Sequence, residues 1–151
     1  MTTIERTKDT KLIREILNHP SIYEHITDDF PPDETIPSLD TEQVLFFKIM
    51  EGSDCIGLFM TYPHNMVCWE LHVALLPKGR GKKTAGAAQQ LFKWLWNNTP
   101  CRRIVGEAPA YNPAIKDWAL RCGMTVYGVN PKSILKKGVL HDCILLGVSK
   151  E

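Results

Sequence analysis

Three stretches of β-favouring residues between positions 44 and 76 are separated by only two short turns, and this pattern constrains the fold more than any other feature of the chain. The stretches are VLFFKIM, CIGLFMTY and MVCWELHVALL, and the turns between them are EGSD and PHN. Strands joined by such short connections pair antiparallel, because a parallel pair needs a long crossover. The sequence therefore predicts an antiparallel three-stranded meander.

Helix and strand patterns flank the meander on both sides. Before it, apolar residues recur at helical spacing between Leu12 and Leu17, with Asp9 placed as an N-cap and Pro20 at the end. The other expected elements are a short edge strand near 3–6, a helical turn over 20–26, a helix over 84–98, a strand over 102–108, a helix over 112–122 and two paired strands over 124–130 and 139–149. This order predicts one α/β (α+β) domain over residues 1–151, with a mixed, mostly antiparallel sheet flanked by helices.

Charge and cysteine content argue against several classes of protein. The chain has 18 Lys and Arg residues against 17 Asp and Glu, so no overall field would attract nucleic acid or an anionic membrane. No apolar run approaches the roughly 20 residues that cross a bilayer, and the polar N-terminus is unlike a secretion signal. The five cysteines form no close pair, which argues against a disulfide framework and a zinc site. We therefore expect a cytoplasmic protein with reduced thiols and no metal, nucleic-acid or membrane partner.

The segment between Leu75 and Ala88 carries the strongest indication of function. A strand passes through Pro77 into a basic turn with two glycines, and the turn leads directly into a helix. Such a junction directs free main-chain N–H groups and the positive end of a helix dipole at one point, which favours a phosphate or diphosphate. The segment lacks the first glycine of a Walker A motif, which argues against a P-loop. From these residues alone, a nucleic-acid patch and a solvated basic loop also stay open.

Two motifs resemble those of the GNAT N-acetyltransferases. RGKKTA at 80–85 is similar to the family's (Q/R)xxGx(G/A) turn, although Lys83 stands where the family usually has glycine. YNPAIKDWALRCGMTVYG at 111–128 is similar to the helix that follows the family's fifth strand. The resemblance covers residues 40 to 150 and implies the GNAT acyl-CoA N-acyltransferase fold, with acetyl-CoA as co-substrate.

The resemblance also implies positions for the coenzyme. In the family, the amides of the turn hold the diphosphate of coenzyme A, and an asparagine lies beside the pantetheine arm. The coenzyme would then lie in a splayed gap between the strands at 66–76 and 102–109. The implied contacts are Leu75, through its main-chain N–H, Arg80, Gly81, Lys82, Lys83, Thr84, Ala85 and Asn112. The family tyrosine that protonates the departing thiolate corresponds to Ala119, so that acid is missing here.

Candidate catalytic residues lie on the third strand of the meander and in the second motif. Glu70 and His72 alternate along WELHVAL and share one face, so either is a candidate for the base that accepts the amine proton. That face could equally be exposed, or the two side chains could satisfy each other. Tyr111 is the nearest substitute for the missing acid and Tyr127 is a second one, although both could be packing tyrosines.

These residues predict an acyl-CoA dependent N-acyltransferase that holds its donor beside a primary amine, of a small molecule or a protein, for direct attack in a ternary complex. The alternative is a GNAT-fold protein without catalysis that serves in binding or assembly. It draws on a weaker resemblance of the segments HPSIY and WELHVALLP to GNAT-like proteins of bacteriophages, some linked to particle assembly. Acidic residues in a loop expected at 27–40 hint at a cationic acceptor, or only keep the loop in solvent. A homodimer stays open.

Overall fold

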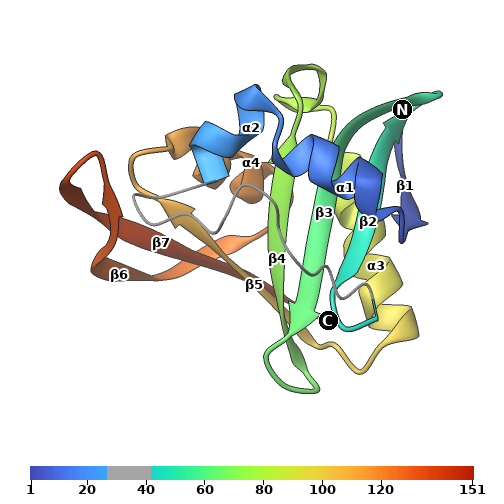
Figure 1. Cartoon of the computed structure of the whole chain (residues 1–151). Coiled ribbons are helices and arrows are strands. Elements are labelled where there is room, and N and C mark those ends of the chain that lie inside the picture. The colour runs from blue at the N-terminus through green and yellow to red at the C-terminus, as the bar shows by residue number, and fades with distance from the viewer. Residues whose placement is uncertain (27–41) are drawn as a thin grey trace.

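The computed structural model describes residues 1–26 and 42–151, so the acidic loop expected at 27–40 lies outside the described residues. Seven strands form one sheet in the order β1-β2-β3-β4-β5-β7-β6 (Figure 1). The strands are β1 (Thr2–Thr7), β2 (Leu45–Glu51), β3 (Asp54–Pro63), β4 (Cys68–Leu75), β5 (Arg103–Pro109), β6 (Thr125–Lys136) and β7 (Val139–Ser149). The helices are α1 (Thr10–Leu17), α2 (Pro20–Ile26), the 3-10 helix η1 (Pro77–Gly79), α3 (Ala85–Asn98) and α4 (Pro113–Arg121).

The sheet is mixed and mostly antiparallel, as the sequence predicts. Strands β2, β3 and β4 form the expected meander, and β6 pairs antiparallel with β7. Among the described strands only β4 and β5 pair parallel, because α3 forms the crossover between them.

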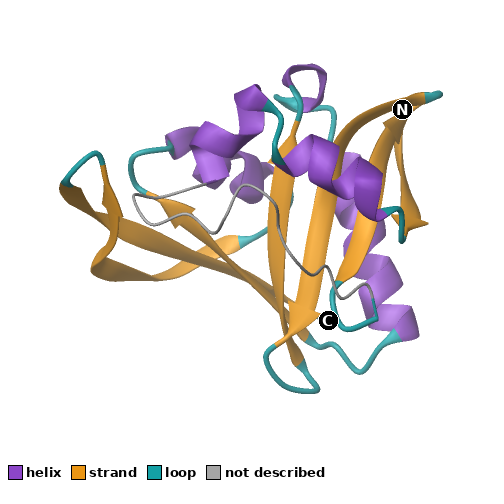
Figure 2. Ribbon diagram, in the orientation of Figure 1, coloured by secondary structure: helices purple, strands orange, loops and turns teal. Residues whose placement is uncertain are grey.

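The helices cover both faces of the sheet (Figure 2). On one face, α1 and α2 pack their apolar side chains, including Ile13 and Ile22, against Phe46, Leu58 and Ala74. On the opposite face, α3 and α4 bury a larger cluster against the other side of the same strands. Its members include Ala88, Leu91, Phe92 and Leu95 of α3, which form the predicted apolar stripe, and Trp118 and Ala119 of α4.

The helix ends follow the predicted signals, and one strand differs from its prediction. The Asp9 carboxylate accepts from the N–H groups at the start of α1, Pro113 begins α4, and Gly123 (φ +98°) ends it. Strand β6 continues to Lys136 instead of ending at residue 130. Its pairing with β7 is interrupted between Asn130 and Ile134, because the intervening proline cannot donate to the ladder, and then resumes.

All five cysteines are free thiols, and three of them are buried while Cys55 and Cys68 are half-buried. Burial raises the pKa of Cys101 to about 11 and that of Cys122 to about 12, which keeps both thiols protonated near neutral pH. None of the described helices combines the length and apolar content needed to cross a lipid bilayer.

Strands β4 and β5 pair over only a short length. Their register joins Cys68 to Arg103, Trp69 to Ile104 and Glu70 to Val105, and it ends there although both strands continue. The remainder of β4 therefore has a partner on one side only, where β3 pairs with it as far as Leu75. This parting is the splayed gap that the sequence resemblance implied.

Candidate active site

The start of α3 presents a group of main-chain N–H donors. The N–H groups of six residues here, Gly81, Lys82, Lys83, Thr84, Gly86 and Ala87, donate to no main-chain oxygen of the described residues. The neighbouring Ala85 N–H bonds the Lys82 carbonyl at 3.3 Å. Unsatisfied donors at a helix N-terminus, together with the helix dipole, form a site for an anion.

The turn before α3 is held in place by a buried hydroxyl. Thr84 is fully buried, and its Oγ1 donates to the Gly79 carbonyl at 3.2 Å while it accepts from Trp118 Nε1 at 2.8 Å. A Cβ at Gly79 would clash with the Ile56 carbonyl, whereas one at Gly81 would meet nothing. The first glycine therefore allows the turn to pack against β3, and the second lies where the surface is open.

Two basic side chains of the turn point away from the free N–H groups. Lys83 Nζ lies 3.2 Å from Glu51 Oε1 on β2, so its side chain does not fill the mouth of α3. Arg80 donates to the Ser21 carbonyl at 2.6 Å and to the Leu75 carbonyl at 3.3 Å. Arg80 therefore joins α2 to the end of β4, and the anion site itself consists of main chain.

The Leu75 N–H points toward the splayed gap. Leu76 N–H bonds the Ile56 carbonyl at 3.0 Å, so residue 76 faces β3. Because consecutive residues of an antiparallel ladder direct their N–H groups to opposite sides, Leu75 directs its N–H away from β3, to the side where β5 has diverged. A ligand carbonyl in the gap can accept a hydrogen bond there.

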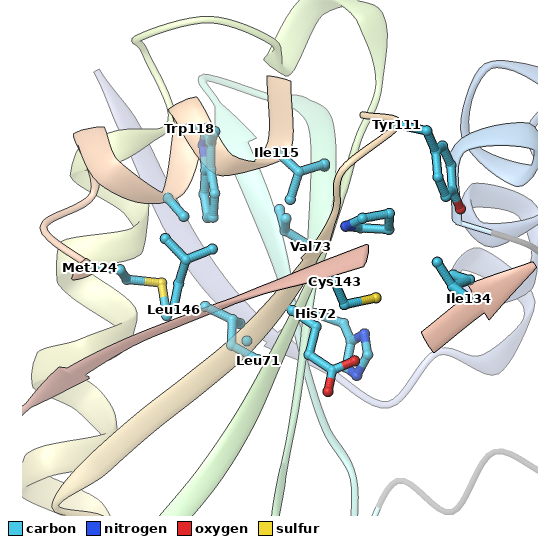
Figure 3. Close-up of a pocket in the computed structure, with 14 residues that line it drawn as sticks. Leu71, His72, Val73, Tyr111, Ile115, Trp118, Met124, Ile134, Cys143 and Leu146 are labelled. Carbon is cyan, nitrogen blue, oxygen red and sulfur yellow. The ribbon is translucent and has the colours of Figure 1, made fainter. Parts of the chain in front are cut away.

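Two adjoining cavities run along this gap. The first, of about 290 Å³, is lined by four of the predicted coenzyme contacts, Leu75, Arg80, Gly81 and Asn112. The second, of about 200 Å³, is lined by the predicted catalytic residues His72 and Tyr111 (Figure 3). The two share Val73, Ile115 and Trp118 as lining residues, so together they lead from the start of α3 to His72.

A cluster of four titratable side chains lies beside the second cavity. The Glu70 carboxylate accepts from Tyr62 Oη and from His72 Nε2, which lies 2.7 Å away, and His64 Nε2 lies 3.4 Å from it. The ring of Tyr62 stacks on that of His72, with centroids 5.8 Å apart. Sequence reasoning missed Tyr62 and His64, although the β3–β4 register pairs Tyr62 directly with Glu70.

The cluster changes the proton affinities of its members. The hydrogen bond from His72 and then that from Tyr62 lower the pKa of Glu70 to about 2, against the opposing effect of burial. Burial and the neighbouring Glu70 carboxylate raise the pKa of Tyr62 above its usual range. Glu70 is therefore an anion at neutral pH. Since this anion binds His72 Nε2, a neutral His72 carries its proton there and leaves Nδ1 as the basic nitrogen.

The two candidate tyrosines lie in different surroundings. Tyr111 lines the second cavity, with its ring edge-on to His141 at 5.0 Å between centroids. Tyr127 is exposed on β6 under the guanidinium of Arg103 and lines neither cavity. Glu107, which the sequence did not indicate as a site residue, is exposed on β5 and lines the second cavity. In the described chain no group of His, Cys, Asp or Glu side chains is arranged to hold a metal ion.

No protein-family model matches the chain, and no curated protein matches it in sequence. Solved structures do match. Spermidine N-acetyltransferase from Vibrio cholerae, in complex with CoA and spermine, superimposes with a TM-score of 0.80 over 98% of this chain and 95% of its own, at 15% identity. The microcin C7 self-immunity acetyltransferase MccE, in complex with acetyl-CoA and AMP, matches with a TM-score of 0.64 over 73% of this chain and 63% of its own, at 22% identity.

The chain has the GNAT acetyltransferase fold. The seven-stranded sheet, the helices on both faces and the diverging β4 and β5 are the features that this fold assignment rests on. In this GNAT fold, the predicted contacts Lys82, Lys83, Thr84 and Ala85 form the turn at α3, while Leu75, Arg80, Gly81 and Asn112 border the first cavity.

Proposed function

We propose that the chain is an acyl-CoA dependent N-acyltransferase that uses acetyl-CoA and transfers the acyl group to a primary amine by direct attack in a ternary complex. The observation that carries this proposal is the group of unbonded N–H donors at α3, which adjoins the first of two connected cavities, with His72 lining the second. Structural neighbours in complex with CoA or acetyl-CoA support it.

The coenzyme is assigned to the turn before α3 and the two connected cavities. Its diphosphate accepts from the free N–H groups of the turn, from Gly81 to Thr84, with Ala85 and Arg80 beside it. The pantetheine arm follows the first cavity past Asn112, and the thioester oxygen accepts from the Leu75 N–H. A hydrogen-bond donor at that oxygen stabilises the negative charge that develops there during attack.

The proton transfers are assigned to the second cavity. His72 Nδ1 takes one proton from the substrate ammonium, and the free amine attacks the thioester carbon. As the carbon–sulfur bond breaks, the nitrogen loses a second proton, which balances the proton that the departing thiolate receives. Glu70 holds the His72 ring in place and stabilises its charged form, because a carboxylate with a pKa of about 2 is itself a weak base. Tyr111 is the candidate that returns a proton to the thiolate, and Ala119 cannot serve.

The acceptor is an amine of a small molecule or a protein. Glu107 at the second cavity and the Glu70 anion beside it supply negative charge for an ammonium group. One structural neighbour carries spermine, which is such a cation. A homodimer stays a prediction, and light scattering would test it by measuring the molar mass in solution.

The alternative is a binding or assembly protein that keeps the fold without the reaction. Ala119 favours it, because the resemblance places the thiolate acid there and this helix position is buried and apolar. Both readings allow coenzyme binding, so turnover separates them.

Calorimetry with acetyl-CoA tests the coenzyme assignment. Wild-type protein should bind, and Gly81→Trp should abolish binding because the indole would occupy the open mouth beside the free N–H groups. Gly138→Trp is the matched control, since Gly138 also has positive φ and open space around it but lies in the β6–β7 turn. Release of free thiol with a panel of amines then tests turnover. Absence of acetyl-CoA binding by the wild type would refute the proposal.

A further inference from the structure

The second cavity has two ends of different chemistry. Figure 3 shows Met124 and Leu146 at one end, and Tyr111 and Ile134 at the other. The first end is buried and apolar, because Leu71, Ala119, Met124 and Leu146 all belong to the core beneath α4. The polar residues of the lining are Tyr111 at the second end and, along the strands between the ends, His72 and Glu107.

Two small residues line the apolar end. Gly106 of β5 lines the cavity, and a Cβ added there would lie 3.9 Å from Met124 Cε and 3.3 Å from the Leu71 carbonyl oxygen. Ala119 of α4 lines the same region with a single methyl group. A larger side chain at Ala119 would therefore occupy part of the cavity, whereas a Cβ at Gly106 would also crowd the Leu71 carbonyl.

The volume exceeds what an acetyl group needs. One water molecule needs roughly 15 Å³ of cavity volume, whereas the second cavity has about 200 Å³ on the same scale. The two carbons and one oxygen of an acetyl group would leave much of this space empty, even with an ammonium group near Glu107. Unfilled apolar space forfeits dispersion contacts, so a longer apolar group is favoured there.

The directions of the two substrates follow from this chemistry. A thioester at the Leu75 N–H lies in the first cavity, which meets the second at Val73, Ile115 and Trp118. The ammonium is drawn to the carboxylates of Glu107 and Glu70, since a buried apolar wall would leave its charge uncompensated. The apolar end beneath α4 is then left for the acyl group.

We infer, on the basis of the proposed function, that the space between Gly106, Ala119, Met124 and Leu146 is an acyl-tail pocket, and that the chain accepts unbranched or branched apolar acyl groups longer than acetyl, such as butyryl. Two additional buried methylenes are expected to tighten binding of the acyl-CoA about tenfold.

Calorimetry with free CoA, acetyl-CoA and butyryl-CoA tests the pocket. The expected result is butyryl-CoA bound about tenfold more tightly than acetyl-CoA. Ala119→Leu should reduce this ratio to about one, because the leucine side chain fills the space. Gly106→Ala should reduce it in the same direction but less. The ratio is measured within each variant, so it is insensitive to a general loss of active protein, and thermal unfolding confirms that each variant is folded.

Leu120→Phe is the matched control, because Leu120 is the exposed neighbour of Ala119 on α4 and the added bulk lies outside both cavities. It should keep the wild-type ratio. Equal affinities of the wild type for acetyl-CoA and butyryl-CoA, with free CoA bound, would overturn the acyl-tail pocket alone. Failure of all three ligands to bind would overturn the proposed function and the pocket with it.

Discussion

The two ends of the proposed site offer a ligand different kinds of group, main-chain groups at one end and side chains at the other. At the start of α3, the groups offered to a ligand are main-chain N–H groups, and the basic side chains of Arg80 and Lys83 bond elsewhere. At β4, the groups are side chains of Tyr62, His64 and His72 gathered around one carboxylate. The first end depends on the path of the chain, and the second depends on the identity of each residue.

This difference sets an order for the effects of substitution. A change in the cluster at β4 removes a functional group directly, so its effect on the reaction should be large. A change in the turn should matter only when it alters the path of the main chain or blocks the open space above it. Replacing side chains at each end therefore tests whether the β4 end depends on side chains and the α3 end on the main chain.

Replacing His72 should have the largest effect. His72→Gln keeps the approximate size of the side chain but removes the basic nitrogen, and loss of a general base lowers kcat by roughly 10²- to 10⁴-fold. Acetyl-CoA affinity, measured by calorimetry, should stay unchanged because the coenzyme is held at the other end. His64→Gln is the comparison, with its longer 3.4 Å contact to Glu70 and a smaller expected loss. Wild-type kcat in His72→Gln would show that the cluster is not catalytic.

Thr84 is the exception at the turn, because its side chain fixes the main-chain path. Thr84→Val leaves the buried Gly79 carbonyl and Trp118 Nε1 without partners, which should lower the free energy of unfolding by about 2 to 4 kcal/mol. Urea denaturation measures the loss. Thr125→Val is the matched control, since Thr125 is exposed and makes only a 3.4 Å contact, and it should change stability by less than about 0.5 kcal/mol. Equal losses in both would remove the special role of Thr84.

The same difference explains what the sequence could predict. The turn at α3 was predicted because its signals are local: a strand, Pro77, two glycines and an apolar helix occur in succession. Half of the cluster at β4 was predicted, because Glu70 and His72 alternate on one strand. Tyr62 joins them only through the β3–β4 register, which no local pattern fixes, and the orientation of Lys83 depends on Glu51 of β2.

Glu70 should affect stability as well as catalysis. Its pKa is lowered to about 2, mainly by His72, so the ionised carboxylate stabilises the fold above its ordinary pKa of 4.5 and this contribution is lost as pH falls toward 2. When the pH is lowered from 4.5 to 2, the free energy of unfolding of the wild type should fall by about 2 kcal/mol more than that of Glu70→Gln. This figure includes a reduction for solvent screening. Urea titrations at several pH values measure this difference. Glu5→Gln, at an exposed ion pair, is the control and should follow the wild type.

Lys83→Ala should have the smallest effect. The Lys83–Glu51 pair is exposed, so its loss should change stability by less than about 1 kcal/mol. Acetyl-CoA affinity should also change little, because the alanine keeps the N–H of residue 83 and the path of the turn. Calorimetry at low and high salt measures both the size and the origin of any change. A tenfold weakening that salt abolishes would mean that Lys83 leaves Glu51 for the diphosphate, and the α3 end would then depend on a side chain as the β4 end does.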